Sequence, residues 1–149
     1  MMRGTHLIKH WSSTQRTVTL SSGEAELLGI VRGCSEALGL QSLARDLGIQ
    51  TAISVCGDSS AAIGICRRAG IGKVRHLTVG QLWVQGLVRS GELRLHKVLG
   101  TTNPADALTK PLARPARDGH LLAMHLRREA GRAASAPEAT ADLDLRLAA

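Results

Sequence analysis

Apolar and polar residues follow two different periods along the first half of the chain. Residues 6–13 (HLIKHWSS) and 16–22 (RTVTLSS) are short, rich in strand formers and separated by polar residues, which is typical of a β-hairpin. A helical spacing of apolar residues then begins at Leu27, and the segment ends at Gly48. Its members are Leu27, Ile30, Val31, Cys34, Leu38, Leu43 and Leu47. The pattern predicts a hairpin followed by a long helix.

The second half alternates between strand-like and helix-like segments. Residues 52–56 read as a strand that passes through Gly57 and Asp58 into a short helix ending near Gly70. Residues 74–93 predict an amphipathic helix that stops at Ser90–Gly91, residues 92–100 a strand, and Asn103–Pro104 the start of a short helix. The order β-β-α-β-α-α-β-α predicts an α/β fold, a mixed sheet covered by helices.

The composition changes after Pro111, where Ala and Arg dominate. We therefore expect a globular domain over residues 1–112 and a tail over residues 113–149. Within the tail, residues 120–134 predict a marginal helix, and the last residues are typical of disorder.

Composition restricts the core and the partners. The chain has no Phe or Tyr and only two Trp, so Leu, Ile, Val and Ala must fill the core. Residues 1–112 carry 13 basic and 7 acidic residues (+6), whereas the tail carries 6 and 5 (+1). A positive globular part favours a polyanionic partner such as nucleic acid. The alternative is a scattered, solubilising surface.

The cysteines and the apolar segments indicate the compartment. Cys34, Cys56 and Cys66 lie in apolar contexts without C-x-x-C spacing, which predicts buried free thiols in a reducing environment. No segment has the pattern of a secretory signal or a membrane span. We expect an intracellular protein, cytoplasmic or nuclear and not secreted, without a membrane partner.

Several carboxylates sit where helices begin, and most have an ordinary structural explanation. Glu24 follows Ser21 by three positions and completes a capping box. Asp58 could cap the helix after its strand, and Asp106 would lie in the first turn of a helix capped by Asn103. Glu26 has no such role and borders the apolar stripe, where a carboxylate is costly unless something compensates it.

A functional interpretation takes these acids together. Strand ends and helix starts are where an open α/β sheet presents its ligand site. Crowded carboxylates repel one another unless a cation, most naturally Mg²⁺, lies between them. Two such ions can activate water and stabilise the leaving oxygen in phosphodiester cleavage.

Four blocks of sequence resemble the ribonuclease H domain of copia-type retrotransposon Pol polyproteins. They are KHWSSTQRTVTLSSGEAELLGI, CGDSSAAIGI, KVRHL and GELRLHKVLGTTNPADALTKPL, within residues 9–112. The resemblance implies a ribonuclease H-like fold, and cleavage of the RNA strand of RNA–DNA hybrids with two Mg²⁺ ions, for which Mn²⁺ is a substitute. It also implies a reverse transcriptase segment upstream in the parent polyprotein.

The resemblance implies roles for individual residues. Glu26, from the EAEL match, Asp58 and Asp106 correspond to three of the family's four catalytic and metal-binding carboxylates. Arg75 and His76 match a basic-His pair that precedes the family's long helix. Lys73, Arg75, His76 and Lys97 are therefore candidate substrate-binding residues, with a solvated or capping role as the alternative for His76. Lys9, Arg67 and Arg68 are further candidates for phosphate contacts.

The fourth catalytic carboxylate lies in the family on a first, central strand, and nothing upstream of Glu24 is acidic here. The resemblance therefore implies a ribonuclease H-like fold that lacks its first strand. Strands 6–13 and 51–57 would then flank a vacant position. Three outcomes are expected: the two half-sheets collapse together, another segment or chain fills the position, or the chain fails to fold alone. The alternative function is a catalytically inactive, basic nucleic-acid-binding remnant of the polyprotein.

Overall fold

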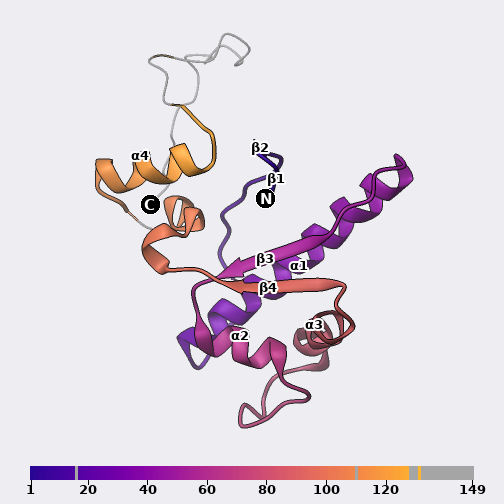
Figure 1. Cartoon of the computed structure of the whole chain (residues 1–149). Coiled ribbons are helices and arrows are strands. Elements are labelled where there is room, and N and C mark those ends of the chain that lie inside the picture. Colours follow the sequence, from indigo (N-terminus) through magenta and orange to yellow (C-terminus); the bar gives the residue numbers. More distant parts are fainter. Residues whose placement is uncertain (16, 110, 128–130, 132–149) are drawn as a thin grey trace, which may run out of the picture.

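The computed structural model describes residues 1–15, 17–109, 111–127 and 131. A short antiparallel hairpin comes first, with β1 (Met2–Arg3) paired to β2 (His6–Leu7). The long helix α1 (Ser22–Asp46) follows, and then β3 (Ile53–Gly57) and α2 (Ser60–Arg67). The chain continues through α3 (Val79–Ser90) and β4 (Leu93–Lys97) to two 3-10 turns, η1 (Gly100–Thr102) and η2 (Pro104–Leu108). Helix α4 (Arg114–Ala123) is the last described element (Figure 1).

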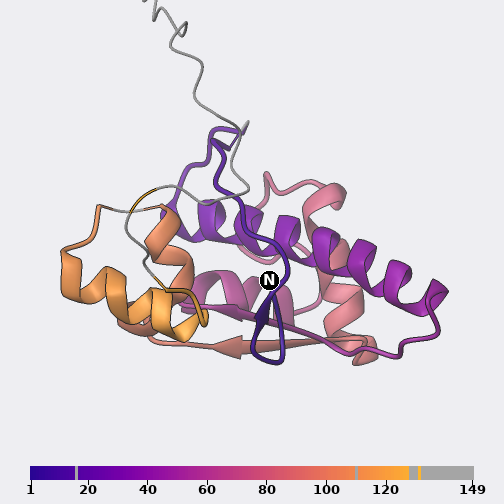
Figure 2. The same ribbon diagram turned by 90° about the horizontal axis from the view of Figure 1, so that it is seen from above.

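Strands β3 and β4 form a two-stranded parallel sheet in which Ile53 pairs with Leu93 and Gly57 with Lys97. Helices α1, α2 and α3 lie on one side of this sheet (Figure 2). The side chains alternate accordingly, since Leu93 and Leu95 are buried while Arg94 and His96 are exposed. The prediction of an α/β fold is confirmed.

The core lies between the parallel sheet and the three helices. Its largest fully buried side chains are Leu27, Leu93, Val84, Cys34 and Cys66. Trp83 packs at its margin. The expectation of an aliphatic core is therefore confirmed.

The two halves of α1 differ in burial. Its buried residues are Glu24, Leu27, Ile30 and Cys34, all in the first half, whereas residues 35–46 include no buried side chain. Leu43 is 56% exposed. The second half of α1 therefore presents apolar surface that no described element covers.

Close packing between helices depends on Gly23 in the first turn of α1. A Cβ atom there would lie 3.0 Å from Cβ of Ala61 on α2. Gly29 and Gly33, further along α1, would meet nothing within 4 Å. The glycine that permits a close approach is thus at the start of the helix rather than in its middle.

The predicted hairpin of residues 6–13 and 16–22 is wrong in position. The only strands described before α1 are β1 and β2, and their pairing is complete by Leu7. Side chains instead fasten the following segment to α1. Lys9 pairs with Glu36 at 2.5 Å, Arg32 Nη1 donates to Ser13 Oγ at 2.7 Å, and Gln15 Nε2 donates to Ala25 O at 2.7 Å. Alternation of apolar residues could not distinguish a strand from an extended segment held by its side chains.

Helix α4 begins earlier than the helix predicted at residues 120–134. It starts at Arg114 with Pro115 in its first turn, where a missing N–H costs nothing, and ends at Ala123. It packs against η2, and His120 and the Met124 that follows the helix are buried. Residues 128–130 and 132–134 of the predicted helix lie outside the described residues, as does the predicted disorder of the last residues. Among the described helices, none is long and apolar enough to cross a membrane.

Candidate functional site at the carboxyl edge of the sheet

Asp58 follows the last residue of β3, at the edge of the sheet where both parallel strands end. Its partly buried carboxylate faces the segment after β4, because a Cβ atom on Gly100 would lie 3.3 Å from Asp58 Oδ2. The cap of α2 is Ser59, whose Oγ accepts a hydrogen bond from Ala62 N at 3.2 Å. The predicted capping role of Asp58 is therefore wrong, because Ser59 is the N-cap of α2.

Glu26 lies in the first turns of α1, on the same side of the helix as Ile30. Ile30 packs against the end of β3, since a Cβ atom on Gly57 would lie 3.5 Å from Ile30 Cδ1. The start of α1 therefore lies near the edge where β3 ends. The side chain of Glu26 is exposed.

Asp106 lies in the 3-10 turn η2, which continues from β4 through η1. Asn103 caps this turn, with its Oδ1 accepting from Ala105 N at 3.2 Å and its carbonyl accepting from Asp106 N at 3.1 Å. Asp106 is partly buried in the first turn. The predicted cap at Asn103 is confirmed, and the ordinary explanation of Asp106 as a first-turn acid holds.

The topology brings Asp58 and the segment after β4 to one edge, with the start of α1 beside it. In the parts of the chain that are described, however, no group of three or more His, Cys, Asp or Glu is arranged to hold a metal ion. The metal site of Glu26, Asp58 and Asp106 thus stays a prediction.

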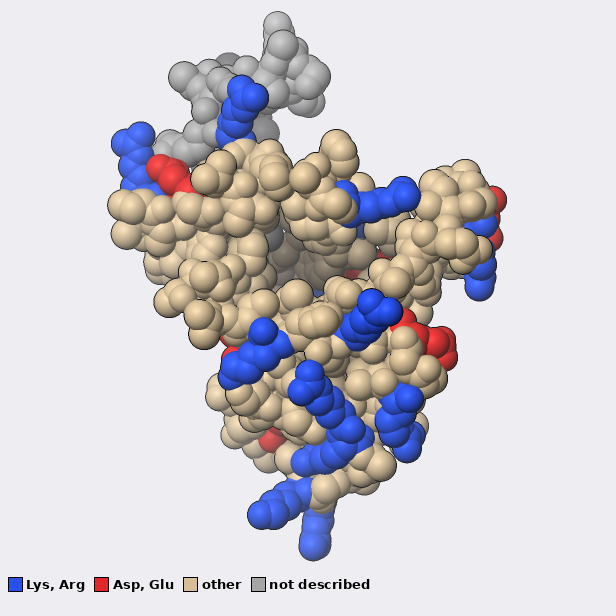
Figure 3. Space-filling view, in the orientation of Figure 1, with Lys and Arg blue, Asp and Glu red and all other residues tan. Residues whose placement is uncertain are grey.

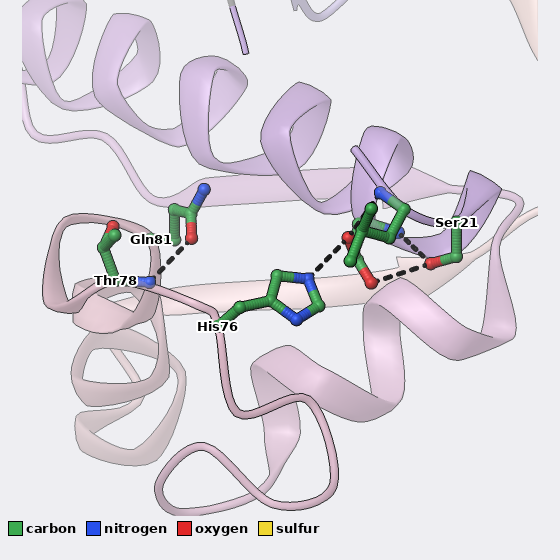
Figure 4. Close-up of polar contacts among 6 residues, drawn as sticks. Ser21, His76, Thr78 and Gln81 are labelled. Carbon is green, nitrogen blue, oxygen red and sulfur yellow. Dashed lines mark hydrogen bonds and ion pairs between the residues drawn. The ribbon is translucent and has the colours of Figure 1, made fainter. Parts of the chain in front are cut away.

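Ser21 is confirmed as the N-cap of α1, and the Glu24 side chain is more buried than that of its neighbour Glu26. Glu24 Oε2 accepts a hydrogen bond from Leu20 N at 3.0 Å, and the Glu24 backbone N–H donates to Ser21 Oγ at 3.3 Å. His76 Nε2 lies 2.9 Å from the same Oε2 (Figure 4). Only 7% of Glu24 is exposed. The contact with His76, aided by the Leu20 amide, holds the pKa of Glu24 below its usual value of 4.5.

His76, one of the candidate substrate-binding residues, is thus held by a carboxylate at the start of α1. It lies in the loop between α2 and α3, two residues before Thr78, which caps α3 by a reciprocal bond with Gln81 (Figure 4). Lys73 and Arg75 in the same loop are exposed. Lys97 ends β4, and its Nζ contacts Ser60 Oγ at the start of α2.

A basic surface covers α2, α3, β4 and the loops between them. Residues 60–97 contain seven Lys or Arg and one acid, Glu92, a net charge of +6 (7 − 1). Lys and Arg side chains gather over this half of the molecule in Figure 3. We name the exposed basic residues of this region the basic face: Arg67, Lys73, Arg75, Arg89, Arg94 and Lys97.

Three of the candidates for phosphate contacts, including Arg67 of the basic face, make contacts within the protein. Lys9 lies outside this region and is paired with Glu36. Arg67 reaches back to donate to Leu95 O at 2.9 Å, and Arg68 donates to the carbonyl of Ile71. The alternation of Leu93, Arg94 and Leu95 along β4 could have predicted from the sequence that Arg94 faces solvent and belongs to the basic face.

Gln85 is a buried polar residue that the sequence pattern did not distinguish. It lies on the core side of α3, where its Nε2 donates to Ile65 O at 2.8 Å and to Gly70 O at 3.0 Å. Its Oε1 accepts from Gly70 N at 3.0 Å. Gln85 thus joins the end of α2 and the start of the loop between α2 and α3 to helix α3.

The cysteines separate into two kinds. Cys34 and Cys66 are fully buried, and burial raises their pKa values to about 12 and about 11. Cys56 is exposed on β3, so the prediction that it is buried is wrong. It alternates with Val55, which packs against the core, and therefore points to the uncovered side of the sheet.

Known proteins similar to this chain are transposon polyproteins. The chain is 32% identical over 116 residues to a retrovirus-related Pol polyprotein from transposon RE2 of Arabidopsis thaliana, which covers 76% of the chain and 8% of that protein. It is 30% identical over 105 residues, 69% of the chain and 8% of the relative, to the Pol polyprotein from transposon TNT 1-94 of Nicotiana tabacum. The Pol polyprotein from transposon RE1 of A. thaliana is 31% identical over 116 residues, with the same coverage as RE2.

The relatives of this chain are therefore retrotransposon Pol polyproteins, and the chain spans about 8% of their length. No model of a known protein family matches the chain, and no solved structure matches it significantly.

Proposed function

We propose that the chain is a ribonuclease H-like domain derived from a copia-type retrotransposon Pol polyprotein. In the parent polyprotein this domain would follow a reverse transcriptase segment and hydrolyse the RNA strand of RNA–DNA hybrids. The observation that carries the proposal is the parallel pairing of β3 with β4, because it directs Asp58 and the segment that bears Asp106 to one edge of the sheet.

The candidate catalytic residues at this edge are Glu26, Asp58 and Asp106. Their carboxylate oxygens are the donors that Mg²⁺ and Mn²⁺ prefer. In the described geometry, however, no three acids are gathered around a common point. The site as it stands does not fit a bound ion, and we assign no catalytic step to one.

Nucleic-acid binding without cleavage is the second candidate function, and the basic face favours it. Seven basic residues and one acid over residues 60–97 would attract phosphates regardless of base sequence. Such a surface needs no metal, so it can function where the carboxylates do not gather. The absence of Phe and Tyr makes base stacking a minor contribution.

The two candidates are separated by measuring binding and cleavage of the same hybrid. The chain is incubated with an RNA–DNA hybrid labelled on its RNA strand, first in Mg²⁺ and then in Mn²⁺. We expect binding, little or no cleavage in Mg²⁺, and at most a trace in Mn²⁺ that Asp58→Asn removes.

Robust cleavage in Mg²⁺ that is lost in Asp58→Asn would show that the site assembles fully, and hydrolysis would become the function of this chain. Cleavage that survives Asp58→Asn would contradict the site assignment. A chain that binds neither hybrid nor duplex would contradict both candidate functions.

A further inference from the structure

The loop between α2 and α3, residues 69–77, contains no helix or strand, and most of its residues are exposed. We name it the basic loop, because Lys73 and Arg75 are both exposed on it. Two glycines, Gly70 and Gly72, add conformational freedom to such a segment. A ligand that binds a flexible loop must order it, which weakens binding unless the fold orders the loop beforehand.

The first part of the basic loop is fixed by two polar side chains. Gly70 N donates to Gln85 Oε1 at 3.0 Å, and Gly70 O accepts from Gln85 Nε2 at 3.0 Å. The Arg68 guanidinium donates to the Ile71 carbonyl and lies against Gly72, where a Cβ atom would be 2.5 Å from Arg68 Cζ. Gly72 also has a left-handed backbone (φ 63°), so glycine alone fits this position without strain.

The last part of the basic loop is held by the start of α1. His76 Nε2 lies 2.9 Å from Glu24 Oε2, and Figure 4 shows the His76 side chain directed at the turn that holds Ser21. The next residue, Leu77, is buried in the core. The two exposed basic side chains of the loop therefore lie between two fixed points.

Glu24 affects a bound polyanion in two opposite ways. Its carboxylate is a negative charge beside the basic loop, and by Coulomb's law it repels phosphates. Its contact with His76 fixes the loop that carries the basic residues. Charge and position thus predict changes of opposite sign in affinity when the carboxylate is replaced by an amide.

We propose that Glu24 is a positioning residue for nucleic-acid binding. Through His76 it holds the basic loop in one shape, with Lys73 and Arg75 ready to contact backbone phosphates. The loop then loses its conformational entropy on folding rather than on binding. This inference rests on the proposed function, because it assumes that the basic face binds nucleic acid.

The test measures the affinity of the full chain for an RNA–DNA hybrid at several salt concentrations. Glu24→Gln removes a negative charge, so charge alone predicts tighter binding. We expect the opposite: affinity falls about fivefold, and the slope of log affinity against log salt decreases by about one. The matched control, Glu92→Gln, removes the same charge from an exposed acid whose side chain contacts Ser90. It should bind as tightly as the wild type or more tightly.

A combined variant separates positioning from a general loss of structure. In a chain that carries Lys73→Gln and Arg75→Gln, Glu24→Gln should cause no further weakening, because the residues that it positions no longer bind phosphate. Circular dichroism at the binding temperature checks that each variant is folded. Equal weakening by Glu24→Gln with and without Lys73 and Arg75 would indicate a merely structural role and would overturn the proposal.

His76→Ala breaks the same contact and leaves the hydrogen bond from Leu20 N to Glu24 in place, so it serves as the test if Glu24→Gln does not fold. It should weaken binding about fivefold, and not at all in the chain that carries Lys73→Gln and Arg75→Gln. Weakening in both chains would mean that His76 contacts the nucleic acid itself, which would overturn the proposal.

Failure of this inference is distinguishable from failure of the proposed function. If the wild type binds the hybrid but Glu24→Gln and His76→Ala bind as tightly, the positioning role is wrong and nucleic-acid binding stands. The same holds if Lys73→Gln with Arg75→Gln binds like the wild type. A wild-type chain that binds no hybrid even at low salt would contradict both.

Discussion

His76 Nε2 lies 2.9 Å from Glu24 Oε2, and this contact joins residues 52 positions apart in the chain. It fastens the loop before α3 to the capping turn of α1. The same Oε2 accepts the Leu20 amide, so one carboxylate contacts both the residue before the N-cap of α1 and a loop that carries basic residues. The contact links the stability of the α1 start to the position of Lys73 and Arg75.

Replacing Glu24 by Gln should lower the melting temperature at neutral pH by about 5 °C, because the cap and the contact with His76 both weaken. The folded pKa of Glu24 lies below 4.5, so the ionised carboxylate stabilises the fold above that pH. That stabilisation is lost as the pH falls through the lowered pKa. Thermal melts between pH 7 and pH 3 should therefore show the difference between wild type and variant shrinking with acidity.

The matched control for this change is Glu92→Gln, which alters an exposed glutamate in the turn before β4. Its melting temperature should stay close to that of the wild type across the series. A difference between Glu24→Gln and wild type that is constant from pH 7 to pH 3 would show that ionisation of Glu24 is not its source.

Two glycines of α1 should respond differently to replacement by alanine. Gly29→Ala should raise the free energy of unfolding by about 1 kcal/mol, because alanine favours helix and nothing lies within 4 Å of the new Cβ atom. Gly23→Ala should gain less or lose stability, because its Cβ atom would lie 3.0 Å from Ala61 Cβ. Urea unfolding of both variants measures the contrast, and equal gains would indicate that α1 and α2 can separate at no cost.

Gln85→Met should destabilise the fold by about 2 kcal/mol, because the backbone groups of Ile65 and Gly70 lose their buried partner. Methionine keeps the size of the side chain, so the loss reports hydrogen bonding. The control is Gln50→Met, in the exposed connection before β3. In chemical denaturation, the free energies of unfolding of the two variants should differ by most of that amount. A Gln85→Met variant as stable as the wild type would mean that water replaces all three hydrogen bonds.

The basic face should bind nucleic acid through its phosphates. Replacing Arg94 and Lys97 by Gln should weaken binding of an RNA–DNA hybrid about tenfold and reduce the slope of log affinity against log salt by about two. The control, Arg45→Gln with Arg127→Gln, removes the same charge outside the basic face. Titrations at several salt concentrations measure both quantities, and equal losses in the two double variants would mean that net charge alone determines binding.

The sequence pattern predicted most elements from α1 to η2 because their boundaries depend on local chemistry. The N-cap at Ser21, the stop at Gly91 and the cap at Asn103 all lie where the residues indicated. Gly91 adopts the left-handed backbone (φ 80°) that ends a helix. Such signals act over a few residues, so they can be recognised in the sequence without knowledge of the tertiary fold.

Features that depend on distant partners could not be predicted in this way. Residues 6–13 and 16–22 are rich in strand formers, but pairing needs a neighbour that the pattern does not supply, and side chains of Ser13 and Gln15 contact α1 instead. His76 could have been a solvated residue, and only the fold places Glu24 beside it. For the candidate site, the positions of Asp58 after a strand and of Asp106 at the start of a later helix followed from the pattern, whereas their separation depends on packing.

The parallel register of β3 with β4 has a consequence for the order of folding. Ile53 and Leu93 are paired although 40 residues (93 − 53) separate them, so this contact closes a long loop that must first lose its entropy. The intervening helices α2 and α3 form from local contacts and bring the two strands together. We therefore expect sheet pairing to be the slow, late event of folding, so that a ribosome-bound chain ending before Leu93 has helices but no parallel sheet.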